Sequence, residues 1–114
     1  MYKEKQDGYT IIPNSIIKNE FLSIEAKGVL IYMISCPPNW IFNLKTLCRD
    51  LNERRTKIEH CLNQLIENGF IRRKVVRENG KIKYYTFDIS KDGLFSPEHY
   101  NYDPLYDDLP FPKN

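Results

Sequence analysis

An Asn-Gly pair at residues 79 and 80 constrains the fold of this chain more than any other feature. Both residues tolerate positive φ, which the favoured two-residue turn of a β-hairpin requires. The flanking segments, 70–76 and 82–89, are rich in β-branched and aromatic residues. They therefore predict the two strands of a hairpin.

The register of this hairpin follows from its loop. With Asn79-Gly80 as the two loop residues, we expect Arg77 opposite Ile82 and Val75 opposite Tyr84. Neither face of the hairpin is then purely apolar. We therefore expect its base to pack on the rest of the domain and its tip to project into solvent.

A helix is predicted over residues 24–35. Ser23 can accept a hydrogen bond from the first turn, Glu25 suits the positive end of the helix dipole, and Cys36-Pro37-Pro38 ends the helix. Apolar residues cover most of its circumference, which is typical of a helix surrounded by other elements. We expect it to be the central helix of the core.

Two further amphipathic helices lie between this helix and the hairpin. The first follows Asn43, a predicted N-cap, and has apolar residues at Leu44, Leu47, Cys48 and Leu51. The second ends at Gly69 and has the clearest apolar stripe of the chain: Ile58, Cys61, Leu62, Leu65 and Ile66. A turn of only a few residues, around Asn52 and Glu53, separates them, which predicts a helix-turn-helix.

The remaining segments frame this domain. We expect residues 1–8 to be a flexible N-terminus, Tyr9 to Ile12 a short strand stopped by Pro13, and residues 14–18 a helical turn. Residues 91–114 have no helical or strand period, which predicts an acidic, Pro/Tyr-rich, disordered tail. Residues 9–90 are then one α+β domain, a winged helix-turn-helix with a three-helix core and a β-hairpin wing.

Several classes of protein are excluded by composition. A chain of 114 residues is long enough for one small domain and too short for two of ordinary size. The three cysteines, Cys36, Cys48 and Cys61, have neither disulfide nor zinc spacing, so no metal is predicted. We expect no catalytic residues, no enzyme activity and no cofactor, because no phosphate loop, paired carboxylates or activated nucleophile is visible. Without an apolar span or a signal segment, a cytoplasmic protein that avoids membranes is predicted.

Charge is divided unevenly along the chain. Residues 1–90 contain 15 Lys and Arg against 10 Asp and Glu, a net +5, whereas residues 91–114 contain 2 against 5, a net −3. The predicted hairpin accounts for most of the basic excess. Its basic residues are Arg72, Arg73, Lys74, Arg77, Lys81 and Lys83.

The polar face of the third predicted helix is a candidate DNA-reading surface. A recognition helix presents its N-terminal part to base edges in the major groove. The candidates for base contact are Thr56, Lys57, His60, Asn63 and Gln64. Arg54 and Arg55, at the turn, are better placed for phosphates. The alternative is an ordinary solvated face, and His60 beside Cys61 is no metal pair because adjacent helix residues diverge.

The basic hairpin is the second candidate surface. Six basic residues on a narrow projection suit a minor groove or a phosphate ridge. All six are candidates for phosphate or groove contact. The alternative is a charged edge that prevents aggregation between sheets.

The acidic tail has three open interpretations. Its aromatic residues alternate with acids, as in a short docking motif, although a disordered linker explains the same composition. A third interpretation is that the tail folds back on the basic wing and competes with DNA.

Residues 9–90 resemble the N-terminal winged-helix domain of DnaD-like replisome organisers and replication initiators of Gram-positive phages and plasmids. The matching features are the Leu22-Ser23 helix start, Ala26-Lys27-Gly28, Pro38 and Trp40, the helix end at 65–70, and the wing. Such organisers usually continue into a second, helical domain, and none is visible here. Free-standing winged-helix proteins on such elements serve as transcriptional regulators or as accessory factors that mark an origin, and the resemblance implies one of these two roles.

These observations predict a sequence-specific protein that binds double-stranded DNA. We expect it to mark an origin of replication or conjugative transfer on a plasmid or phage. The alternatives are a transcriptional regulator with the same binding mode and a protein-protein adaptor that uses the basic wing. Further expected partners are replication or transfer proteins and a second copy of the chain on DNA.

Overall fold

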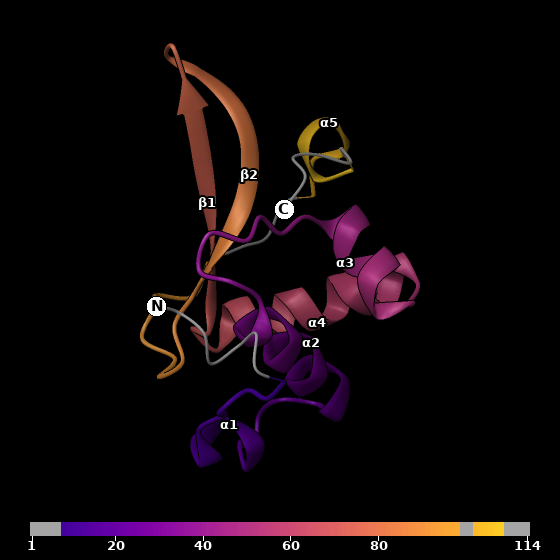
Figure 1. Ribbon diagram of the computed structural model, residues 1–114, viewed down its shortest axis with the longest axis vertical. Helices are drawn as coiled ribbons and strands as arrows, with labels where there is room; N and C mark the ends of the chain where they lie inside the picture. The colour runs from indigo at the N-terminus through magenta and orange to yellow at the C-terminus, as the bar shows by residue number, and fades with distance from the viewer. Residues whose placement is uncertain (1–7, 99–101, 109–114) are drawn as a thin grey trace.

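The computed structural model describes residues 8–98 and 102–108. Figure 1 shows a bundle of helices from which a long hairpin projects. The helices are α1 (Asn14–Ile17), α2 (Ile24–Ser35), α3 (Leu44–Leu51), α4 (Arg55–Glu67) and α5 (Pro104–Asp107), and the strands are β1 (Ile71–Glu78) and β2 (Lys81–Ile89). Most of the predicted flexible N-terminus, residues 1–7, lies outside the described residues.

Side-chain caps fix the starts of α2 and α3. The Ser23 side chain accepts a hydrogen bond from the amide of Ala26, at 3.1 Å. Asn43 accepts from the amide of Thr46, and the Thr46 hydroxyl accepts from the amide of Asn43, which completes a capping box. Both predicted caps are confirmed. Asn52, in the left-handed conformation with φ 54°, ends α3.

The apolar core lies where α2 and α3 pack on α4 and where the base of the hairpin meets α4. Its fully buried side chains include Leu30 and Met33 of α2, Leu47 of α3 and Leu62 of α4. Ile71 and Phe87 extend the core to the base of the hairpin. The three-helix core with an attached hairpin is the predicted α+β arrangement.

The hairpin has the predicted loop, but its register towards the base differs from the prediction. Asn79 and Gly80 have φ of 55° and 77°, and Arg77 lies opposite Ile82 as predicted. Val75, however, lies opposite Tyr85 rather than Tyr84, because an irregularity after Val76 shifts the pairing by one residue. The prediction for Val75 was wrong since a β-bulge leaves one residue unpaired, and a loop motif does not reveal it.

Residues 9–12 do not form the predicted strand. The sheet of the described chain has two strands, β1 and β2, so this segment has no strand beside it. Ile12 packs against the core while Ile11 is 74% exposed. The segment therefore packs on the core through one of its two isoleucines without being part of a sheet.

The segment after β2 is also ordered against the domain. The amide of Ser90 donates to the carbonyl of Phe70 at 2.8 Å, and the amide of Phe95 donates to the carbonyl of Gly69 at 3.1 Å. Packing of the domain thus continues past the predicted boundary at residue 90. The predicted division at residue 90 and the disordered tail over 91–114 stay predictions, beside which the structure describes these contacts and α5; residues 99–101 and 109–114 lie outside the described residues.

No helix within residues 8–98 and 102–108 has the length and apolar character needed to span a membrane.

Candidate nucleic-acid interface

The turn between α3 and α4 consists of residues 52–54. The left-handed Asn52 reverses the chain, and the amide of Glu53 donates to the carbonyl of Cys48 at 3.0 Å. α4 then starts at Arg55 without a side-chain cap. The two helices therefore meet across a tight turn, as a helix-turn-helix requires.

The outward face of α4 is polar and accessible. Thr56, Lys57 and His60 are exposed, and Asn63 is partly exposed on the same side. Lys57 Nζ lies 3.3 Å from Glu53 Oε1, an exposed i,i+4 pair that contributes little to stability. These four candidates for base contact are thus available to a ligand from solvent.

Gln64, the fifth candidate, has a structural partner. Its Oε1 accepts from the amide of Ser23 at 2.9 Å, and its Nε2 donates to the Ser23 hydroxyl at 3.1 Å. Both polar ends of this side chain therefore join α4 to the start of α2. This geometry makes Gln64 a positioning residue and not a free base-reading side chain.

The two arginines at the turn differ in their surroundings. Arg54 is exposed at the N-cap position of α4. Arg55 lies over the ring of Tyr102, 4.0 Å from its centroid, and its Nη2 is 3.3 Å from Asp108 Oδ2. A segment distant in the sequence thus contacts the first residue of the predicted recognition helix.

The base of the wing carries paired charges. Arg72 Nη2 lies 3.3 Å from Asp88 Oδ2, and Lys74 Nζ lies 4.0 Å from Asp88 Oδ1. Arg72 also lies over the Phe95 ring, 4.3 Å from its centroid. Asp88 therefore offsets part of the positive charge that the sequence assigned to this end of the hairpin.

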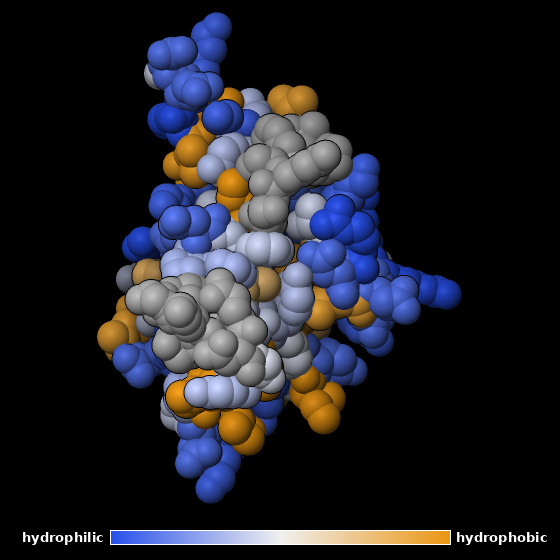
Figure 2. Space-filling model, in the orientation of Figure 1, coloured by the Kyte–Doolittle hydropathy of each residue, from blue (hydrophilic) through white to orange (hydrophobic). Residues whose placement is uncertain are grey.

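The tip of the wing is a second exposed basic surface of the hairpin. Arg77, Lys81 and Lys83 are exposed, and Lys83 forms an exposed pair with Glu78 at 3.6 Å. Figure 2 shows this end of the molecule as hydrophilic. The tip can therefore approach phosphates without first losing a buried contact.

Arg73 is the one candidate of the wing that is held by a buried partner among the described residues. Its side chain is 16% exposed, and its Nη2 donates to Oδ2 of Asp107, which is fully buried. Arg73 also lies over the Tyr85 ring at 3.9 Å, and Tyr85 contacts Tyr106 edge-on at 5.0 Å between centroids. In Figure 1, α5 lies between the wing and α3.

The environment of Asp107 is unfavourable for a carboxylate. Burial raises the pKa of the Asp107 carboxyl, and the hydrogen bond from the amide of Asp103, together with the Arg73 guanidinium, offsets only part of this effect. Keeping the Asp107 carboxylate charged in this buried position therefore costs desolvation free energy.

The surroundings of Cys61 and Cys48 favour the neutral thiol over the reactive thiolate. Cys61 is buried, and burial raises the pKa of its thiol, as it does for Cys48. His60 points to the exposed side of α4. In the part of the chain that the structure describes, no group of three or more His, Cys, Asp or Glu side chains is placed to hold a metal ion.

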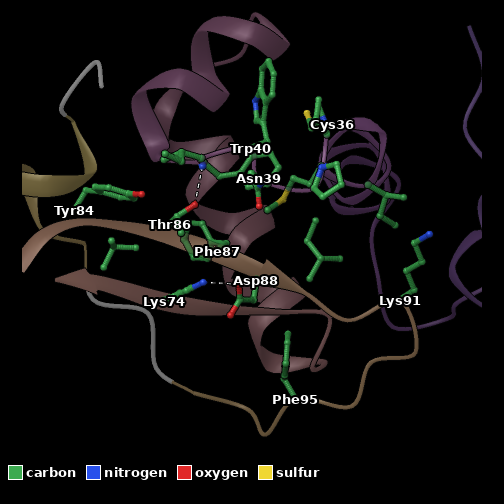
Figure 3. Close-up of a pocket in the computed structure, with 18 residues that line it drawn as sticks. Cys36, Asn39, Trp40, Lys74, Tyr84, Thr86, Phe87, Asp88, Lys91 and Phe95 are labelled. Atoms are coloured by element: carbon green, nitrogen blue, oxygen red, sulfur yellow. Dashed lines mark hydrogen bonds and ion pairs between the residues drawn. The ribbon is translucent and has the colours of Figure 1, made fainter. Parts of the chain in front are cut away.

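A hollow of about 690 Å³ lies between the wing and the segment that follows α2. It is lined by residues 36–42 and by wing residues that include Lys74, Tyr84 and Asp88 (Figure 3). The amide of Phe42 donates to the Thr86 hydroxyl at 2.8 Å and ties these two walls together. The hollow is separate from the exposed face of α4, and sequence reasoning did not anticipate it.

A family model described as a helix-turn-helix domain matches residues 19–71. The matched segment contains α2, α3 and α4 and ends at the first residue of the wing. With the hairpin that follows, the fold is a winged helix-turn-helix. The match supports a DNA-binding domain of a kind that is typically not enzymatic.

No curated protein and no solved structure matched the chain. The matched family is described by its helix-turn-helix alone. The resemblance to DnaD-like replication proteins therefore stays a prediction.

Sequence reasoning left open that the acidic tail folds back on the basic wing, but it did not locate the contacts of residues 102–108 with Arg55 and Arg73. A local signal was present, because Asp103 is followed by Pro104, an N-cap residue followed by the residue favoured in the first helical position. The Asp103 side chain accepts from the amide of Leu105 at 3.0 Å, as such a cap requires. The partner of this short helix could not be inferred from spacing along the chain.

Proposed function

We propose that this protein binds double-stranded DNA and reads its sequence with the exposed face of α4 in the major groove. The observation that carries the proposal is the accessibility of Thr56, Lys57 and His60 on the second helix of a helix-turn-helix. Threonine, lysine and histidine side chains can donate hydrogen bonds to base edges there. Asn63, partly exposed on the same face, adds a side chain suited to adenine.

The tip of the wing supplies the second contact of the proposed complex. Arg77, Lys81 and Lys83 form a narrow basic projection that suits phosphates or a minor groove. Contacts of this kind fix register and contribute affinity that depends on salt. The exposed Arg54 adds a phosphate contact at the start of α4.

The biological role that we propose is an accessory factor that marks an origin of replication or conjugative transfer on a plasmid or phage. Its support is the resemblance of residues 9–90 to replication proteins of such elements. A transcriptional regulator would use the same DNA-binding mode. Mapping the occupied sites in cells distinguishes the two, because they lie at an origin in one case and over promoters in the other.

Selection from randomised duplex DNA tests the binding mode. The full chain is expected to enrich one defined motif. The double variant Lys57→Ala, His60→Ala is expected to lose about ten-fold of the preference at one or two positions of that motif, since a good base contact contributes about 1–3 kcal/mol of discrimination. Lys18→Ala is the control, because it removes one exposed charge at the end of α1.

Two results would contradict the proposal. If no motif is enriched, the chain does not read DNA sequence, and the adaptor role with an acidic protein partner takes its place. If the double variant selects the wild-type motif with unchanged preference, α4 is not the reading helix.

A further inference from the structure

Two arginines from different elements face one short acidic segment. Arg55, the first residue of α4, contacts Tyr102 and Asp108, while Arg73 of β1 contacts Asp107. The two arginines are 18 positions apart in sequence, yet residues 102–108 reach both of them. They therefore bind one short segment from two directions, the start of the predicted recognition helix and the wing.

The two carboxylates that contact these arginines resemble a nucleic-acid backbone in their chemistry. Adjacent carboxylates, Asp107 and Asp108, each accept a hydrogen bond from an arginine guanidinium. Phosphate oxygens accept from arginine in the same two-pronged geometry as carboxylates. A strand of DNA whose phosphates meet Arg55 and Arg73 would therefore satisfy the groups that the two aspartates satisfy.

Residues 102–108 contact the domain, but few of these contacts stabilise the bound segment. α5 has four residues, too few to be stable alone, and its Leu105 is 64% exposed. Asp107 Oδ1 is buried and has no hydrogen-bond partner within the described residues. A buried ion pair adds little net stability, because desolvation of the charges cancels much of their attraction. The remaining stabilisation of the segment comes from the contact of Tyr106 with Tyr85 and from the packing of Tyr102 against the core.

We propose that Arg55 and Arg73 form a binding site for DNA backbone phosphates and that residues 102–108 occupy this site in the free protein. Duplex DNA then binds by displacing this segment, so the segment lowers the affinity for all duplexes by the same factor. The inference rests on the proposed function, since it names further phosphate contacts of that same surface.

The test compares two full-length double variants that lose equal charge. In Asp107→Asn, Asp108→Asn the two carboxylates that contact Arg73 and Arg55 are neutralised. In Asp92→Asn, Glu98→Gln two exposed acids of the preceding segment are neutralised instead. Binding of each variant to one duplex is measured by fluorescence anisotropy at one salt concentration.

The first variant is expected to bind about ten-fold more tightly than wild type, within the usual range for coupling between two binding events. The control variant is expected to change affinity less than about three-fold. Equal gains in both variants, or no gain in either, would overturn the inference and leave the proposed function standing. If neither variant nor the wild type binds duplex DNA, the proposed function itself fails.

A second measurement follows the segment directly. The backbone amide signals of Tyr102 and Leu105 are recorded by NMR in the wild-type chain as duplex is added. Displacement predicts that they move towards their positions in the Asp107→Asn, Asp108→Asn variant. Amide signals that keep their starting positions while the duplex is bound would show that DNA does not displace the segment.

Discussion

Side chains that look equivalent on a helical wheel have different tasks on α4. His60 and Gln64 both occupy its polar side, but His60 is exposed while Gln64 bonds to Ser23 through both polar ends. The apolar stripe predicts which residues face the core, since burial follows from helical period. It does not predict the hydrogen bonds of Gln64, because their partner, Ser23, lies 41 residues away and its position depends on how α2 crosses α4.

At this scale we predict that Gln64→Ala destabilises the domain by about 1–2 kcal/mol, because the amide of Ser23 loses its acceptor. Urea unfolding of the full chain measures the loss. Asn63→Ala is the matched control and is expected to stay within about 0.5 kcal/mol of wild type, as for an ordinary surface substitution. A relaxed base preference with unchanged stability in Gln64→Ala would instead make Gln64 a base-reading residue.

Among the elements, those defined by local chemistry were predicted best. The capped helices α2 and α3 begin at the predicted residues because Ser23 and Asn43 bond to amides three positions away. The bulge in the wing and the docking of α5 depend on contacts between elements, and the sequence pattern does not contain them. The strand expected at 9–12 failed for the same reason, because a strand needs a neighbour.

The junction between α4 and the wing gives the prediction for this scale. Gly69 has φ of +79°, and a Cβ there would lie 2.6 Å from the carbonyl oxygens of Gly93 and Phe95. We expect Gly69→Ala to lower the free energy of unfolding by about 3 kcal/mol, through backbone strain and this overlap. Urea unfolding is again the measurement.

Gly28→Ala is the matched control for this substitution. Gly28 lies within α2, and a Cβ there would meet no atom within 4 Å. It is expected to raise stability by about 1 kcal/mol through helix propensity. If Gly69→Ala were as stable as the wild type, residues 90–95 would not pack on this junction.

Over the whole molecule, the two ends of the structure differ in character. The wing end is basic and hydrophilic, whereas exposed apolar side chains gather at the end that carries α1 (Figure 2). These are Ile11, Ile17, Phe21 and Ile24. The sequence predicted the basic end from the charge of the hairpin. That part of the acidic segment lies against this charge was one of three interpretations that the sequence left open.

The most direct test of DNA binding by α4 and the wing is an NMR titration of the isotope-labelled full chain with duplex DNA at low salt. We predict that the largest shifts of backbone amides occur at Thr56, His60 and Asn63 of α4 and at Arg77 and Lys81 of the wing tip, with Ile17 and Phe21 unchanged. Shifts confined to Ile17, Phe21 and their neighbours, with α4 and the wing tip unchanged, would contradict it.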